Sequence, residues 1–189
     1  MILVRLIQIV TLIWALSEVG LILYTRRNFR RGLPRDCGSR PFLWCAIVAG
    51  IAAGTAVQTV SFTRIRIPEP WLLGFSLLLL VGGLVIRWIA ILTLGRYFST
   101  RVAIQQDHRL IQTGLFRLVR HPSYTGLLLL FIGMALSYGN WLSFAVIMVP
   151  FLAALLYRIR VEETSLIEVL GQDYLDYAQS TKCLLPGIF

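Results

Sequence analysis

Five long apolar runs constrain the fold of this chain more than any other feature of its sequence. A helix that crosses a bilayer needs about 20 apolar residues, because every backbone amide there must be paired within its own segment. Three runs meet that length and two are shorter. They cover residues 2–24, 42–62, 71–94, 124–138 and 141–157. The hydrophobic fraction of 57% and the mean hydropathy of +0.75 exceed what a soluble core of this size absorbs. The sequence therefore predicts an all-α polytopic membrane protein with about five transmembrane helices.

The organisation along the chain is that of a single integral membrane domain over residues 1–189. The first run contains a passable signal-cleavage site, but it continues to Tyr24 and is followed by arginines, which is typical of a retained anchor. The last two runs are separated only by Gly139 and Asn140, which predicts a tight hairpin of two short helices. Most polar residues capable of chemistry follow residue 94. We therefore expect residues 1–94 to form a helical scaffold and residues 95–189 a catalytic half.

The basic excess fits either a nucleic-acid surface or the cytoplasmic edge of a membrane protein. Lysine and arginine number 18 against nine acidic residues, for a net charge of +9. The arginines collect between apolar runs and form no stripe along one helix, which favours a lipid bilayer as partner and excludes nucleic acid. The links after the first and third runs are rich in arginine, whereas the link after the second run carries only Arg64 and Arg66. This bias predicts an N-terminus outside and a C-terminal tail in the cytosol.

Three further features concern residues within or beside the helices. Arg87 lies inside the third run, where we expect it to snorkel to the interface or to pair with an acid such as Glu18 in a structural role. The three cysteines have no CxxC pair and no ligand-like spacing to either histidine, so no metal site is predicted. Gly126 and Gly133 suit helix packing within one chain as well as between copies, and the oligomeric state stays open.

The fourth run begins with Arg120-His121-Pro122-Ser123-Tyr124, a segment suited to binding an anion. Proline is favoured at a first helical position, so a helix starting there would point its free amides and positive dipole end at a carboxylate or phosphate. Arg120 and His121 could instead contact lipid headgroups, with Tyr124 in the interfacial aromatic belt. Both interpretations fit the residues equally well.

Two other segments carry polar groups near the same face. Residues 108–116 mix polar and apolar side chains without periodicity, as in a loop that supplies backbone groups to a cofactor. Arg158 and Glu162 lie four residues apart on one helix face, which fits a surface ion pair worth about 0.3–0.5 kcal/mol. The pair could instead hold a carboxylate substrate on Arg158 and a positively charged cofactor near Glu162.

The order of these motifs resembles the isoprenylcysteine carboxyl methyltransferase family in a short prokaryotic form. The shared pattern runs from His-Arg-Leu-Ile at residues 108–111 through Thr113-Gly114 and Arg-His-Pro-Ser-Tyr-x-Gly to Arg-x-x-x-Glu-Glu at residues 158–163. It covers about half of the chain, and its ordered combination is far more specific than any one part. Phe116 departs from the tyrosine expected at its position.

The resemblance implies an integral membrane enzyme that uses S-adenosylmethionine to methylate the carboxylate of a prenylated cysteine or a similar amphipathic acid. It assigns Arg158 to the substrate carboxylate and implies a cytosolic cofactor pocket made by the loop before the fourth helix and the C-terminal tail. The cofactor contacts that it implies are His108, Arg109, Leu110, Ile111, Phe116, His121, Pro122, Ser123, Tyr124 and Glu162. Together, Arg158 and Glu162 would be the catalytic pair.

The chemistry of an O-methyl transfer agrees with these residues. A carboxylate is ionised at neutral pH, so its methylation needs alignment but neither a base nor a metal. The absence of a strand followed by GxGxxG argues against a soluble Rossmann-type methyltransferase. Three alternatives stay open: a phospholipid N-methyltransferase, a sterol-type membrane reductase, and a membrane scaffold without enzymatic activity.

Overall fold

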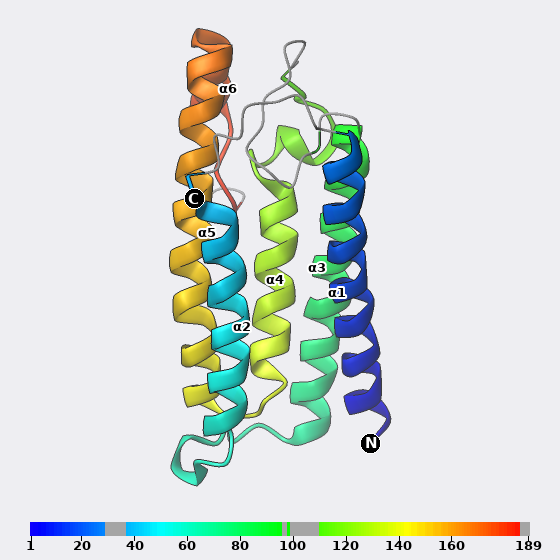
Figure 1. The fold of residues 1–189 in the computed structure, drawn as a ribbon. Coiled ribbons are helices and arrows are strands. Elements are labelled where there is room, and N and C mark those ends of the chain that lie inside the picture. Colours follow the sequence, from blue (N-terminus) through cyan, green and yellow to red (C-terminus); the bar gives the residue numbers. More distant parts are fainter. Residues whose placement is uncertain (29–36, 96–97, 99–109, 186–189) are drawn as a thin grey trace.

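The protein is a bundle of helices. The computed structural model describes residues 1–28, 37–95, 98 and 110–185 (Figure 1). Its elements are α1 (Ile2–Asn28), α2 (Ser39–Val57), the 3-10 turn η1 (Ser61–Thr63), α3 (Glu69–Leu94), the 3-10 turn η3 (Gly114–Arg117), α4 (Pro122–Leu136), α5 (Trp141–Leu170) and α6 (Gln172–Ser180). Helices α1, α2, α3 and α5 are long and apolar enough to cross a membrane, and α4 is a shorter apolar helix. The predicted all-α polytopic membrane fold is thus confirmed.

The fifth helix is longer than its apolar run over residues 141–157 and extends beyond the end that we expected at residues 158–163. Helix α5 has 30 residues and stops only at Gly171, whose φ of 57° suits glycine. Beyond the apolar run the helix becomes amphipathic, with Arg158, Ile159 and Ser165 buried on one face. Helix α6 follows directly and buries Tyr174 and Tyr177. A search for apolar runs misses this extension because Arg158, Arg160, Glu162 and Glu163 end the apolar run.

Helices α3 and α4 pack so closely that three glycines lie in their interface. A Cβ atom on Gly83 would lie 2.5 Å from the Gly126 carbonyl oxygen, and one on Gly126 would lie 2.6 Å from the backbone nitrogen of Arg87. A Cβ on Gly133 would similarly approach the Ser76 carbonyl oxygen to 2.6 Å. Gly126 and Gly133 therefore serve packing within the chain. This close approach brings the backbone of α3 next to the beginning of α4.

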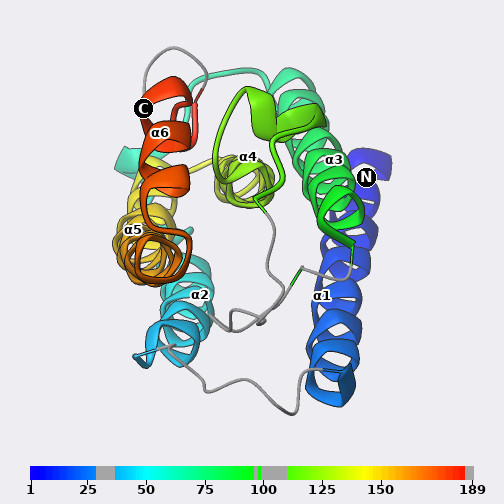
Figure 2. The same ribbon diagram turned by 90° about the horizontal axis from the view of Figure 1, so that it is seen from above.

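Helix α4 lies between α3 and α5. Seen from above, α1 lies beside α3 and α2 beside α5, so that a helix pair flanks α4 on either side (Figure 2). The buried centre lies between α4 and α5, where the Phe131 and Phe151 rings stack with centroids 4.1 Å apart. Both rings are fully buried, as are Leu80 and Leu130. The membrane-facing sides of the outer helices are apolar and exposed, as expected for a chain in lipid.

The predicted turn between α4 and α5 is confirmed. Gly139 has a φ of 64°, and buried Asn140 caps α5 by accepting from the Leu142 and Ser143 amides at 2.8 and 3.1 Å. The Asn140 amide also donates to the Val60 carbonyl at 2.9 Å. One side chain thus joins the turn to the segment after α2.

Candidate active site

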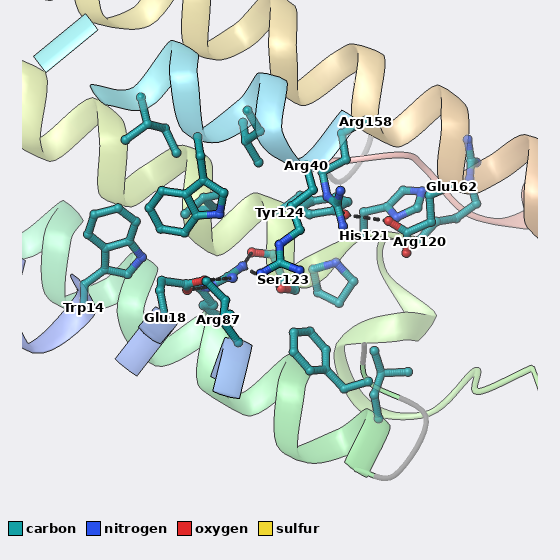
Figure 3. Close-up of a pocket in the computed structure, with 18 of the residues that line it drawn as sticks. Trp14, Glu18, Arg40, Arg87, Arg120, His121, Ser123, Tyr124, Arg158 and Glu162 are labelled. Carbon is teal, nitrogen blue, oxygen red and sulfur yellow. Dashed lines mark hydrogen bonds and ion pairs between the residues drawn. The ribbon is translucent and has the colours of Figure 1, made fainter. Parts of the chain in front are cut away.

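A cavity lies at the end of the bundle where α4 begins (Figure 3). Its walls come from helices α1 to α5 and from the segment before α4. The lining residues are Trp14, Glu18, Ile22, Arg40, Leu43, Trp44, Ile47, Arg87, Leu94, Phe98, Phe116, Arg120, His121, Pro122, Ser123, Tyr124, Leu127, Arg158 and Glu162. Four arginines and two glutamates therefore face a space whose other lining residues are mostly apolar. Such a space can hold a molecule with both charged and apolar parts.

Arg158 and Glu162 occupy successive turns of α5 and are joined by one side chain of α4. The Tyr124 hydroxyl accepts from Arg158 Nε at 2.9 Å and donates to Glu162 Oε2 at 2.6 Å. Arg158 and Glu162 therefore do not form the surface ion pair that the sequence allowed, because Arg158 is only 5% exposed. Both charges are held at the cavity wall in fixed positions.

A second contact fixes Arg158 from the opposite side. Its Nη1 donates to the Ser39 hydroxyl at 3.1 Å, and Ser39 is fully buried at the start of α2. Arg40, the next residue, lines the cavity. The beginning of α2 thus contributes both a support for Arg158 and a further positive charge.

The wall opposite α5 is formed by η3 and the first turn of α4. Pro122 is the first residue of α4 and is fully buried, as the motif predicts. Phe116 is buried at the end of η3, and its carbonyl oxygen accepts a 2.7 Å hydrogen bond from Tyr177 of α6. Burial raises the pKa of Tyr177 to about 12, so its hydroxyl keeps the donated proton at neutral pH.

Glu163 braces this wall from outside the cavity. Its Oε1 accepts from Arg120 Nε at 2.8 Å and from the Tyr174 hydroxyl at 3.3 Å, and His121 Nε2 lies 3.3 Å from the same oxygen. Arg120 also donates to the carbonyl oxygens of Ala178 and Thr181 at 2.9 and 2.6 Å. The neighbouring acids thus act differently: Glu162 lines the cavity and Glu163 positions its wall.

The segment after α6 completes the brace. It runs beside the start of α4, where the Arg120 and His121 amides donate to the carbonyl oxygens of Lys182 and Cys183 at 2.8 and 3.1 Å. The Thr125 hydroxyl donates to the Leu184 carbonyl at 2.6 Å. Of the C-terminal tail that we expected to form part of the pocket, residues 158–189, Arg158 and Glu162 line the cavity, but no described residue of the segment after α6 does. That segment supports the residues that do.

The brace brings together three side chains that could ligate a metal. Ligand atoms of His121, Glu163 and Cys183 lie within 4.8 Å of one another, a proximity that their sequence spacing did not indicate. The Arg120 guanidinium already supplies a positive charge to Glu163 at this point. Burial, together with the Glu163 charge, raises the pKa of the Cys183 thiol to about 11, so the thiol is neutral at pH 7.

The predicted partnership of Arg87 with Glu18 is confirmed. Arg87 Nε and Nη2 donate to the two Glu18 oxygens at 2.6 and 2.9 Å, and both side chains are 7% exposed. Arg87 Nη1 also donates to the Ser123 hydroxyl and carbonyl at 2.9 and 3.2 Å. A buried, bidentate ion pair between α1 and α3 thus holds the first turn of α4.

The structure places the predicted site residues in three groups. Phe116, residues 121–124, Arg158 and Glu162 line the cavity. Leu110 and Ile111 are half-buried and do not line it. His108 and Arg109 lie outside the described residues.

Sequence reasoning missed the part of the wall made by the first 94 residues, which we expected to be scaffold only. Trp14, Glu18, Arg40, Trp44 and Arg87 all line the cavity. Two charged residues inside apolar runs were the available signal, because a charge at that depth is costly unless it is paired or functional. The two tryptophans gave no such signal, because aromatic residues are common in membrane helices.

The fold and the site together define a polytopic helical membrane protein with a charged cavity at one end of the bundle. Residues 76–168 match the model of the isoprenylcysteine carboxyl methyltransferase (ICMT) family. Over these residues the chain belongs to this family.

Known relatives agree with this assignment. The chain is 37% identical over 123 residues to protein-S-isoprenylcysteine O-methyltransferase A of Arabidopsis thaliana, covering 62% of this chain and 61% of the relative. It is 35% identical over 113 residues to the Saccharomyces cerevisiae protein-S-isoprenylcysteine O-methyltransferase, covering 59% and 47%. The solved eukaryotic intramembrane Ras methyltransferase ICMT superposes with a TM-score of 0.59 at 29% identity, over 78% of this chain and 53% of that one. The chain thus spans about three fifths or less of these relatives' lengths.

Proposed function

We propose that this protein is a methyltransferase that transfers a methyl group from S-adenosylmethionine to the carboxylate of an isoprenylcysteine or a similar lipid-like acid. The observation that carries the proposal is the Arg158–Tyr124–Glu162 arrangement on the cavity wall. It places a cation suited to a carboxylate one helical turn from an anion suited to a positively charged cofactor. The family match over residues 76–168 supports this function over amine methylation, nicotinamide-dependent reduction and a scaffold role.

The residues present fit S-adenosylmethionine. Its sulfonium is positively charged, and Glu162 supplies a carboxylate on the cavity wall. Its amino-acid carboxylate fits the positive end of α4, where His121 is the N-cap and makes no capping bond with its side chain. Phe116, Leu94 and Phe98 provide apolar surface for an aromatic ring. When bound, the cofactor supplies an activated methyl group.

The contributions of the protein are orientation and charge. The acceptor carboxylate is already ionised at neutral pH, so no side chain must remove a proton. Arg158 orients this carboxylate, and its bonds to Ser39 and Tyr124 fix the guanidinium in place. The carboxylate loses its charge as the ester forms, so an arginine that bound the ground state too tightly would slow the reaction. Because Arg158 also donates hydrogen bonds to Tyr124 and Ser39, it binds the ground-state carboxylate less tightly.

The arrangement of the helices supports a cytosolic active site and an N-terminus outside. The helix ends joined by the two arginine-rich links lie at the end of the bundle that holds the cavity (Figure 1). The link with only Arg64 and Arg66 lies at the other end. By the positive-inside rule, the cavity end faces the cytosol. A soluble cofactor would then enter from the cytosol while a prenyl chain stays in lipid.

The test is transfer of radiolabelled methyl groups from S-adenosylmethionine to N-acetyl-S-farnesylcysteine by the purified protein in lipid. We expect a base-labile ester, and we expect Arg158→Ala to abolish its formation while cofactor binding persists. The exposed Arg160 on the same helix provides a matched control, because Arg160→Ala removes a positive charge away from the cavity. If the protein binds the cofactor but methylates no prenylcysteine, the search for the acceptor turns to other lipids. The absence of cofactor binding would refute the proposal.

A further inference from the structure

A second cavity continues the first along the same helices. The catalytic cavity contacts α1 at Trp14 and α2 at Ile47, and the second cavity begins at Ala15, which adjoins Trp14, and at Ile51, about one helical turn from Ile47. The floor continues likewise along α4, from Leu127 to Met134. We call the second cavity the lower trough. It lies between α1 and α2, which stand apart in the view from above (Figure 2).

The wall of the lower trough suits an apolar chain. Two threonines in it, Thr11 and Thr55, bond their hydroxyls to carbonyl oxygens of their own helices at 2.8 Å. Their methyl groups and the neighbouring Ala15, Ile51 and Met134 provide apolar surface. Along α1 the trough spans residues 4–15, which corresponds to about 16 Å of helix. An extended hydrocarbon chain fits such a space better than a compact polar group.

A pair of tryptophans separates the two cavities. The rings of Trp14 and Trp44 lie 6.3 Å apart at an interplanar angle of 21°, so α1 and α2 are bridged by one aromatic contact at this depth. Trp14 also meets Phe131 of α4 edge to face at 5.3 Å. The three rings thus extend from α1 to both α2 and α4 at the deep end of the catalytic cavity.

Trp14 carries an additional sign of a ligand. It is 4% exposed and lines the catalytic cavity, yet its indole Nε1 has no hydrogen-bond partner among the described residues. Trp14 lies one helical turn from Glu18, on the side away from the cytosolic end of α1 (Figure 3). A buried N–H without a partner costs free energy unless something approaches it. The π-electrons of an unsaturated chain are a weak acceptor for such a group.

We propose that the Trp14–Trp44 pair forms the end wall for the apolar tail of the acceptor and thereby sets the tail length that the enzyme prefers. This inference rests on the proposed function. With Arg158 holding the carboxylate, the tail extends along α1 and α2 until it meets the paired rings. Longer tails must displace Trp44, which is half-buried and therefore easier to move than Trp14. Removing the Trp44 ring joins the catalytic cavity to the lower trough.

The experiment compares kcat/KM for N-acetylcysteines carrying geranyl, farnesyl and geranylgeranyl groups in the full-length protein reconstituted in lipid. We expect Trp44→Ala to raise the ratio of geranylgeranyl to farnesyl kcat/KM by about three- to tenfold, because the longer tail gains buried apolar area. Trp44→Phe should give a smaller rise. Trp71→Ala is the matched control, because Trp71 is an exposed indole in the first turn of α3, and it should leave the ratio unchanged.

A second substitution tests whether the lower trough receives the longer tail. Ala15 lines the end of the trough nearest Trp14, so adding Ala15→Phe to Trp44→Ala should return the ratio toward the wild-type value. If Trp44→Ala does not fold, Trp44→Leu carries the same test. A wild-type enzyme that is active while the ratio stays unchanged in the Trp44 variants overturns this inference alone. A wild-type protein that binds the cofactor but methylates none of the three acceptors overturns this inference and redirects the proposed function to another lipid acceptor, whereas a protein that binds no cofactor overturns both.

Discussion

The Tyr124 hydroxyl joins Arg158 to Glu162 across the interface between α4 and α5. It accepts from the cation and donates to the anion, so both directions of its hydrogen bonding are used. Among the residues that the structure describes, Arg158 and Glu162 form no direct ion pair with each other. The tyrosine therefore keeps the two charges apart and available to different molecules.

Tyr124→Phe should lower kcat/KM about 10- to 100-fold, because Arg158 and Glu162 each lose a hydrogen bond to the hydroxyl, a loss worth about 1–3 kcal/mol. The helices should still assemble, since the ring is retained. Tyr138→Phe is the control: the Tyr138 hydroxyl bonds to Thr55 at the other end of the bundle. Steady-state kinetics of both variants check the prediction, and equal activities would contradict it.

Removing either partner of the Glu18–Arg87 pair should destabilise the protein by about 3–5 kcal/mol, because the remaining charge is buried alone. The double variant Glu18→Leu with Arg87→Met should lose less stability than either Glu18→Ala or Arg87→Ala. It should nevertheless lose the proposed methyltransferase activity, since Ser123 loses its bonds to Arg87. Thermal unfolding in detergent measures the first effect. A double variant that equals the sum of the singles would refute the coupling.

The fold was largely predictable because a membrane-spanning helix can be recognised in a sequence by its length and its apolar composition. The four long helices and the short α4 all follow from apolar runs, and the turn at Gly139 and Asn140 follows from residue type. Arg87 could be paired with Glu18 in advance because an isolated charge at that depth would be costly. These inferences use physics that acts within one segment or on one buried charge.

The site was less predictable because its walls depend on how segments meet. Nothing local to Trp14 or Trp44 shows that they face each other, and nothing local to Glu163 shows that Arg120, His121 and Tyr174 converge on one oxygen. The last turns of α5, beyond residue 163, were missed for a different reason. They follow charged residues and lie outside the apolar run, so a search for membrane-length runs cannot detect them.

Asn140→Ala should reduce the free energy of unfolding by about 1–3 kcal/mol, because it removes the cap of α5 and the bond to the Val60 carbonyl. Activity per folded molecule should be unchanged, since Asn140 lies at the end of the bundle away from the cavity. Ser137→Ala is a suitable comparison, because that hydroxyl bonds only to the neighbouring Met134 carbonyl. Chemical denaturation resolves the difference, and equal stabilities would contradict the predicted role of Asn140.

Alkylation of Cys183 by iodoacetamide should be slow at pH 7.5, because only the thiolate reacts and burial raises the pKa of this thiol to about 11. The raised pKa also means that ionisation favours unfolding. Its contribution to stability is complete below about pH 9 and is lost as the pH approaches 11. Single-cysteine variants that retain Cys183 or the exposed Cys37 allow direct comparison by mass spectrometry. Faster labelling of Cys183 at pH 7.5 would refute the predicted burial.

The pairing of Arg120 and His121 with Lys182 and Cys183 imposes an order on biosynthesis. A nascent chain can insert α1 to α4 and form the Arg87–Glu18 pair while the ribosome is still translating α5. At that stage α4 is in place, but Lys182 and Cys183, whose carbonyl oxygens hold the backbone of Arg120 and His121, have not yet been made, because they are encoded some sixty codons later. The cavity consequently acquires its final shape only after every helix is in the membrane, so a partly synthesised chain should not compete for the cofactor.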